Sequence, residues 1–335
     1  MFENLKRPVV ASLTLFALAA LPAGAQQLPK PGQLALETAR EYREQARYPE
    51  SSHVLKVGEA DPIRAKRTPT KQSRRGPDGT GPELAVWASA VSVEVGKPID
   101  LFAEVASGGQ PVLPLEMTAE IAGPAGEIVA QVPYHDDGRT PDRRAGDGVW
   151  SARFSMPAGL DPEGAAPYMV RATARLLDGD VRQAAGGFLY SNPSAHLTGR
   201  YRDAVRNGNL VISAEVEVKE AGRFHLAGTL YSLAGDTIGT AQAAANLEPG
   251  RRWIQLSFYG LMFHDRKVAG PYRLGTLALA TSSRMPNALN DLVENAYVTK
   301  GYKLGVMTAL PFAEPKLLES ASRLEAEAMR SQVAQ

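Results

Sequence analysis

The chain has 335 residues, enough for about two domains, and its hydrophobic content of 44% and charged content of 22% are ordinary for a globular protein. The formal net charge of +1 excludes a strong overall attraction to nucleic acid or to an anionic membrane. Aromatic residues at 7% and 24 prolines favour strands and turns over a long helical bundle.

Residues 1–25 have the three parts of an export signal. Lys6 and Arg7 give a positive start, residues 9–21 form an apolar run, and residues 23–25 offer a small-residue cleavage site. The apolar run is short for a membrane span, although an uncleaved anchor is the alternative. We therefore predict a signal peptide, a mature chain without a membrane span, and a periplasmic or secreted location.

The sequence contains no cysteine. An exported protein could use disulfides, so these domains must be stable through their hydrophobic cores alone. The absence of cysteine also removes the attachment point for the lipid of a bacterial lipoprotein, which favours a soluble mature protein.

Two segments precede the strands. Residues 26–56 are predicted to hold one short amphipathic helix, because apolar residues recur at helical spacing within 32–47. We expect its apolar stripe to dock on the protein itself, with a partner as the alternative. Residues 57–82 mix six basic residues with proline and glycine, which predicts a flexible linker. A basic run can also bind anionic polymers, but no aromatic residue is interleaved with these charges, so a solvated tether is preferred.

Apolar and polar residues alternate with a period of two from residue 83 onward. About seven short strands within 83–193 predict an immunoglobulin-like β-sandwich. Residues 194–312 repeat the pattern and predict a second, jelly-roll-like sandwich. Residues 313–335 are predicted to form a C-terminal helix, which either packs on the second sandwich, frays or mediates dimerisation. The predicted fold class is all-β: two tandem antiparallel sandwiches with short terminal helices.

The loop at residues 134–150 concentrates the special chemistry of the chain. Asp136, Asp137, Asp142 and Asp147 are the candidate metal ligands, since carboxylate and backbone oxygens suit calcium and nearby glycines let the backbone fold inward. In the alternative interpretation the loop is purely structural: the aspartates accept backbone N–H groups, and arginines pair part of the charge. A catalytic loop is the least favoured interpretation.

Other candidate site residues are isolated. The pair His264 and Asp265 suggests acid–base chemistry, but the sequence has no recognisable hydrolase, protease or phosphate-binding motif, and its histidines are too scattered for a zinc site. Exposed aromatic residues could form a sugar-binding platform, although a tryptophan in a sandwich is more often part of the core. The candidates are Trp87, Trp253, Tyr259 and Tyr272.

Two stretches carry a family resemblance. The run 134–150, YHDDGRTPDRRAGDGVW, resembles the signature loop of exported bacterial Ig-like domains, including the choice-of-anchor group and an uncharacterised proteobacterial secreted family. Residues 252–265 and 268–274 resemble the C-terminal sandwich of that family. The resemblance covers about 83–312 and implies tandem sandwiches and export, but no activity. It also implies a folded N-terminal domain, for which residues 26–82 are too short.

Three functional hypotheses follow. The first is an exported, non-enzymatic binding or adhesion protein with a structural calcium loop and a cell-surface or glycan partner, not nucleic acid. The second is a carbohydrate-binding protein or the accessory part of a secreted hydrolase. The third is an enzyme that uses His264 and Asp265.

Overall fold

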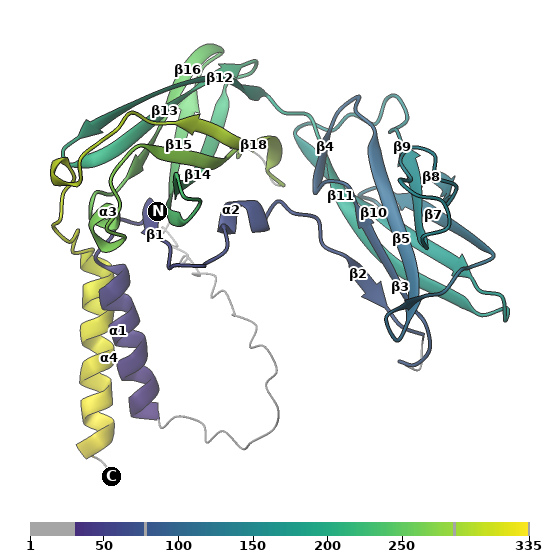
Figure 1. Ribbon diagram of the computed structural model, residues 1–335, viewed down its shortest axis with the longest axis horizontal. Coiled ribbons are helices and arrows are strands. Elements are labelled where there is room, and N and C mark those ends of the chain that lie inside the picture. Colours follow the sequence, from purple (N-terminus) through teal and green to yellow (C-terminus); the bar gives the residue numbers. More distant parts are fainter. Residues whose placement is uncertain (1–30, 77–78, 284–285, 334–335) are drawn as a thin grey trace, which may run out of the picture.

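The structure is a computed structural model that describes residues 31–76, 79–283 and 286–333. β-Strands are the main secondary structure of this chain, arranged in two sandwich-like units with helices that extend from one of them (Figure 1). The predicted all-β fold class is confirmed. The expected export signal lies outside the described residues. None of the described helices is long and apolar enough to cross a membrane.

The first sandwich has two facing sheets. In one, β3 lies between β2 and β5, and β5 also pairs with β6 and β9; the other has the order β4-β11-β10-β7-β8. The β4–β11 pair is parallel. The strands are β2 (Gln72–Arg74), β3 (Glu83–Ala88), β4 (Ser92–Glu94), β5 (Ile99–Ser107), β6 (Gln110–Pro111), β7 (Glu116–Ala122), β8 (Ile128–Pro133), β9 (Val149–Phe154), β10 (Ala165–Arg175) and β11 (Val181–Ser191).

Alternation along the strands decides which side chains form the core of this unit. On β5, Leu101, Ala103 and Val105 are buried, whereas the intervening Phe102 and Glu104 are partly exposed. Successive residues of a strand point to opposite faces, so the aliphatic side chains meet the other sheet. The same alternation leaves Phe102 on the outer face, where the candidate site described below is found.

The second sandwich packs the sheet β12-β13-β16 against the sheet β1-β15-β14-β17-β18, and all its strand pairs are antiparallel. One hydrophobic core lies between the two sheets, and α3 adds buried residues to it. The elements are β1 (Ser52–Val54), β12 (Ala195–Arg206), β13 (Asn209–Val218), β14 (Gly222–Ser232), β15 (Thr237–Leu247), β16 (Gly250–Phe258), α3 (Leu261–Asp265), β17 (Tyr272–Thr281), β18 (Ala288–Val298) and a 3-10 turn, η1 (Leu304–Val306).

The segment before the first sandwich is held against the second one. We call residues 48–67 the strap. Within it, β1 pairs with β15, and α2 (Pro62–Ala65) contacts β14 and β17. Farther along, β2 pairs with β3 of the first sandwich. The contacts of α2 and β2 correct the flexible-linker prediction for residues 57–82. Its basic composition indicated a tether, but basic residues of this segment form ion pairs with the two sandwiches, Arg64 with Glu294 and Lys71 with Glu104.

Asp61 fixes the strap to β14. Its side chain is 7% exposed, and it accepts hydrogen bonds from the hydroxyls of Thr229 and Tyr231, each at 2.7 Å. It also caps α2 by accepting two backbone N–H groups at 2.9 and 3.2 Å. Burial alone would raise the pKa of Asp61, but hydrogen bonds from Thr276, Thr229 and Tyr231 outweigh it and lower that pKa.

Two helices pack side by side in opposite directions and project from the second sandwich (Figure 1). They are α1 (Pro31–Gln45) and α4 (Pro315–Val333). Ala39 and Ala321 are both fully buried, so small side chains let the helices approach closely. Arg43 donates two hydrogen bonds to Glu325, at 2.8 and 2.7 Å. The sequence predicts both helices, but their apolar stripes cover each other instead of docking separately on a sandwich.

We expect Asp61→Ala to lower the free energy of unfolding by about 3 kcal/mol, because it leaves several buried donors without an acceptor. Urea denaturation measures the loss, and Glu248→Ala, which removes an exposed carboxylate, is the control. The pKa of Asp61 is lower in the folded state than in the unfolded state. Its carboxylate therefore stabilises the fold at pH values above the ordinary carboxyl pKa, and this stabilisation is lost as the pH falls through the folded-state pKa. Equal stability of the two variants near neutral pH would contradict this.

Candidate functional site

The loop between β8 and β9 brings together three of its four candidate metal ligands. Carboxylate oxygens of Asp136, Asp142 and Asp147 all lie within 4.8 Å of one another. Asp142 is buried, Asp136 is partly buried and Asp147 is exposed. Three carboxylates at this spacing form an all-oxygen donor set of the kind that a hard cation such as calcium takes.

Asp136 closes the loop. Its two carboxylate oxygens accept the backbone N–H groups of Gly146 and Gly148, at 2.7 and 3.0 Å. Both glycines have positive φ, 72° and 83°, a conformation that other residues rarely adopt. A single side chain therefore bridges ten and twelve residues of sequence and holds the end of the loop beside its beginning.

Asp142 has a comparable position in the middle of the loop. It accepts the backbone N–H groups of Gly138 and Arg144, the latter at 3.0 Å. Burial would raise the pKa of Asp142, but backbone donors outweigh this effect and lower that pKa. The loop thus contains the aspartate–backbone hydrogen bonds that a purely structural role requires. It also contains the cluster of carboxylates that a cation would need.

Asp137 does not join the other three aspartates. Its carboxylate accepts the backbone N–H of Arg139 at 2.9 Å and lies 4.0 Å from the Nε of the same residue. This corrects the predicted set of four ligands: Asp136 and Asp137 are neighbours, and only the first of them faces the cluster. Arg139 is the one arginine of the loop with an ion pair among the described residues, and that pair does not involve the three converging carboxylates.

The outer face of the first sandwich carries an aromatic pair next to this loop. Trp87 on β3 lies directly opposite Phe102 on β5, and their rings stack with centroids 5.7 Å apart at an angle of 20°. The Lys71 ammonium lies 4.2 Å from the indole centroid and pairs with Glu104 at 2.7 Å. Both aromatic rings are partly exposed, so they do not belong to the core.

A groove of about 540 Å³ lies between the aromatic pair and the loop. Pro141 and Arg143 of the loop line one part of it. Asp100 and Arg153, which form a two-fold hydrogen-bonded pair at 2.8 and 3.1 Å, line another. Trp87 also lines a second groove of about 560 Å³, next to the glycines of β11. Volumes of this size suit small-molecule ligands.

The sequence indicates Trp87 as a candidate but gives no such indication for Phe102, Asp100 and Arg153. One feature of the sequence could have indicated Phe102. It lies on the same face of β5 as the charged residues Asp100 and Glu104, and not on the buried face. An exposed aromatic residue on the polar face of a strand can indicate an interaction site. The neighbourhood of Trp87 and Phe102 depends on the β3–β5 register, which the pattern alone does not give.

The other aromatic candidates are less suited to a ligand. The guanidinium of Arg202 lies 4.1 Å from the ring centroid of Trp253, much as Lys71 lies over Trp87, but Trp253 does not line the groove of the aromatic pair. Tyr272 is completely buried in the second core. Tyr259 is partly buried, and its hydroxyl donates to the carbonyl of Leu310 at 2.8 Å.

His264 and Asp265 lie next to each other on α3 but have separate partners. His264 Nε2 is 3.1 Å from the carbonyl of Met307. Asp265 accepts from Arg47 at 2.9 Å and from the hydroxyl of Tyr48. These contacts join α3 to the strap and to the segment after β18. They hold the fold together and do not pair the two side chains with each other.

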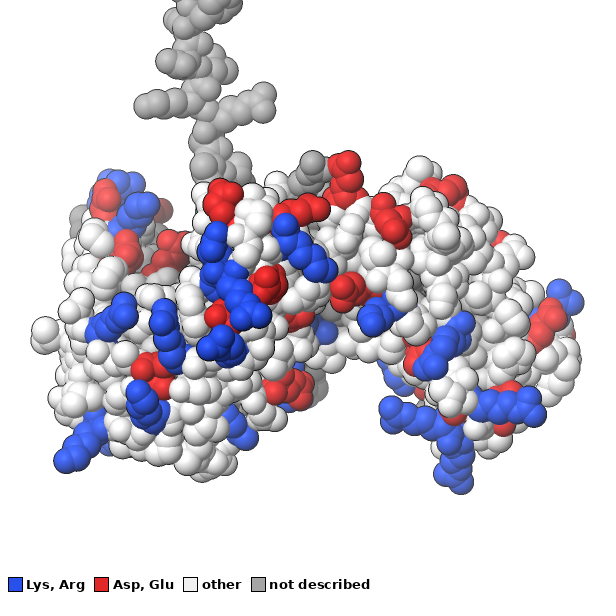
Figure 2. All heavy atoms as spheres, turned by 90° about the horizontal axis from the view of Figure 1, so that it is seen from above, with Lys and Arg blue, Asp and Glu red and all other residues white. Residues whose placement is uncertain are grey.

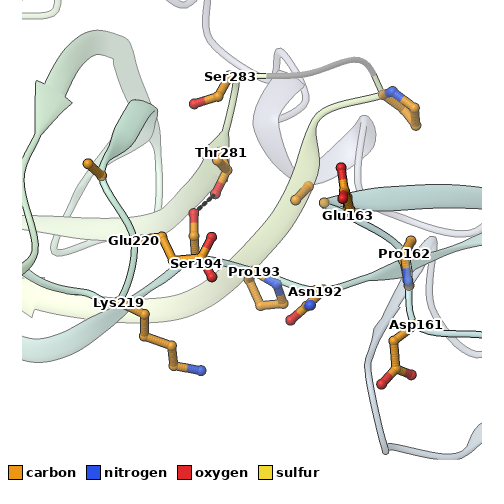
Figure 3. Close-up of a pocket in the computed structure, with 14 residues that line it drawn as sticks. Asp161, Pro162, Glu163, Asn192, Pro193, Ser194, Lys219, Glu220, Thr281 and Ser283 are labelled. Atoms are coloured by element: carbon orange, nitrogen blue, oxygen red, sulfur yellow. Dashed lines mark hydrogen bonds between the residues drawn. The ribbon is translucent and has the colours of Figure 1, made fainter. Parts of the chain in front are cut away.

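A further cavity of about 590 Å³ lies where the two sandwiches meet (Figure 3). Asp161 and Glu163 come from the first unit, and Lys219 and Thr281 from the second. Ser194, between the units, lies 3.2 Å from the hydroxyl of Thr281. No aromatic side chain lines this cleft among the described residues. Figure 2 shows acidic and basic side chains intermixed on the face seen from above, in keeping with the small net charge.

Comparison with known proteins gives one family match. Residues 194–291 match the family described as "Domain of unknown function (DUF4785) C-terminal domain". The second sandwich therefore resembles an uncharacterised domain, in agreement with the predicted resemblance to an uncharacterised family. No curated protein matches the chain.

Solved structures give distant likenesses. A DUF4785 family protein from Legionella pneumophila is 17% identical with a TM-score of 0.45, over 64% of this chain and 58% of its own length. This chain thus spans less than two thirds of that protein. The soluble domain of PmoD from Methylocystis is 11% identical, with a TM-score of 0.21, over 42% of this chain and 97% of its own. Squid arrestin is 9% identical, with a TM-score of 0.23, over 69% of this chain and 97% of its own length. None of these likenesses indicates a function.

We expect Asp136→Ala to destabilise the first sandwich by about 2 kcal/mol in the presence of a chelator, because two backbone donors lose a charged acceptor. Asp137→Ala serves as the matched control and should cost less than about 1 kcal/mol, since it removes a local turn contact at a largely exposed position. Urea titration of both variants gives the comparison. A loss of the same size in both would show that Asp136 does not hold the loop closed.

Proposed function

We propose that this chain is an exported, non-enzymatic binding protein whose ligand-binding surface is the outer face of the first sandwich. The proposed ligand is a carbohydrate. The observation that carries the proposal is the partly exposed pair of Trp87 and Phe102 at the edge of a groove that also contains the charged pair of Asp100 and Arg153.

The groove offers the two kinds of contact that sugars use. Aromatic rings bury the apolar C–H faces of a pyranose, and carboxylate and guanidinium groups exchange hydrogen bonds with its hydroxyls. Lys71 lies over one face of the indole, so a sugar would contact the part of Trp87 that lines the groove. Because the rings sit on paired strands, the platform is rigid before the ligand arrives, which lowers the entropic cost of binding.

We also propose that the loop binds calcium through Asp136, Asp142 and Asp147. Their convergence supports this, and each carboxylate oxygen can accept from a backbone N–H while another lone pair faces an ion. Asp142 itself lines the groove together with Pro141 and Arg143. Calcium would therefore stiffen one wall of the carbohydrate site and would not take part in a reaction.

Trp87→Ala should abolish binding on a glycan array, because it removes the aromatic surface of the groove. Trp253→Ala is the matched control: it also removes a partly exposed tryptophan with a cation over its ring from a strand, but one that does not line this groove. Circular dichroism of both variants checks folding. Absence of any glycan ligand for the wild type, or equal loss in both variants, would refute a carbohydrate site at Trp87.

Calcium should raise the melting temperature of the wild type, since a ligand that binds only the folded state stabilises it by mass action. The increase should disappear with a chelator and in Asp142→Ala and Asp147→Ala, whereas Asp137→Ala should keep it. Differential scanning calorimetry measures the shift. A melting temperature that does not respond to millimolar calcium would rule out the proposed ion.

A further inference from the structure

A cavity of about 520 Å³ lies between the strap and the outer face of the second sandwich. Its floor is made of strand residues with small side chains, Ala227 on β14 and Ala278 on β17, which lie opposite each other in the sheet. Because these side chains end at Cβ, the strap cannot fill the space above them. Leu55 and Ile63 of the strap supply apolar walls. The aspartate loop does not line this cavity, whereas Lys66 lines both the cavity and the second groove beside Trp87.

The charged lining of this cavity is mainly basic. Lys66 and Arg67 come from the strap, and His53 and His225 come from β1 and β14. Within the described part of the chain, Glu59 is the one carboxylate that lines it, and its side chain accepts the backbone N–H of Lys56 at 2.8 Å. The polar side chains of Thr240 and Gln242 on β15 complete the rim.

Arg67 is the most informative of these residues. Its guanidinium is partly buried, and its one described hydrogen bond is a long one, 3.4 Å to the carbonyl of Leu279. Among the described residues no carboxylate forms an ion pair with it, although Asp291 acts on it from a greater distance. Burial lowers the pKa of Arg67, and the negative charge of Asp291 offsets only part of this effect. A partly buried cation without a counterion is costly unless something anionic approaches it.

The neighbouring histidine experiences the same field. Burial lowers the pKa of His225, and the positive charges of Arg223, Arg67 and Lys66 lower it further. An anion in the cavity would reverse that electrostatic effect and favour the protonated imidazole. Three side chains from two different elements would then donate to one ligand.

We propose that this cavity binds a small organic anion whose carboxylate or phosphate group is held by Arg67, Lys66 and His225, with its apolar part over the alanine floor. A guanidinium can bind either oxyanion through two parallel hydrogen bonds, and the ammonium of Lys66 adds a point charge. The volume exceeds what a bare oxyanion needs, so the ligand carries an organic group. The proposal is independent of the carbohydrate site and of calcium.

Isothermal titration calorimetry of the full mature chain with sulfate, inorganic phosphate and benzoate tests this. Saturable binding is expected, and stronger binding of the two inorganic anions would assign a phosphate-bearing ligand, whereas stronger binding of benzoate would assign a carboxylate. Arg67→Gln should weaken binding roughly tenfold or more. Arg64→Gln is the matched control, because Arg64 is an exposed neighbour on α2 that pairs with Glu294 at 2.6 Å.

A second variant separates loss of the site from loss of folding. Ala227→Leu keeps every charge but fills the floor of the cavity, so it should abolish benzoate binding even if Arg67→Gln proves unstable. Sulfate remains a dianion between about pH 6 and 8, so its affinity should rise as the pH falls and His225 takes up a proton. Failure of all three probes to saturate, or binding that neither Arg67→Gln nor Ala227→Leu changes, would overturn the proposal.

Discussion

The buried carboxylate of Asp61 is the contact on which the arrangement of this chain depends. It joins the strap to β14 by two hydroxyl donors and at the same time begins α2. A charge that is removed from water must keep its donors, so the strap has little freedom to leave the sheet. With the strap in place, β1 completes the edge of the second sandwich, and the cavity above the alanine floor acquires its basic wall.

Much of the fold follows from periodicity in the sequence. The alternation along β5 or β13 identifies strands because each has one face toward a core. Periodicity is local, however, and cannot show that Ser52 pairs with Ala241 or that Asp61 meets Tyr231. The strap is hard to predict for that reason, because its contacts with the second sandwich depend on single side chains such as those of Asp61 and Arg64.

The same distinction applies to the candidate sites: those made of consecutive residues can be predicted from the sequence, and those made of residues from separate strands cannot. The aspartate-rich loop is recognisable because its residues are consecutive, and three of its four carboxylates do converge. Asp137 separates from them because its own backbone neighbour satisfies it, a detail of turn geometry that spacing does not reveal. The pairing of Trp87 with Phe102 and the basic cavity each combine residues from separate strands, so they become visible only once the register is known.

The position of the strap has a topological consequence. The second sandwich is discontinuous in sequence, since its edge strand β1 precedes the first sandwich and its other strands follow it. The first sandwich is therefore an insertion within the second. A fragment cut at residue 194, where the matched family region begins, would lose β1 and expose the hydrogen-bonding edge of β15. Unpaired edges recruit other strands, so such a fragment would be prone to self-association, whereas excising the inserted unit would leave the second sandwich whole.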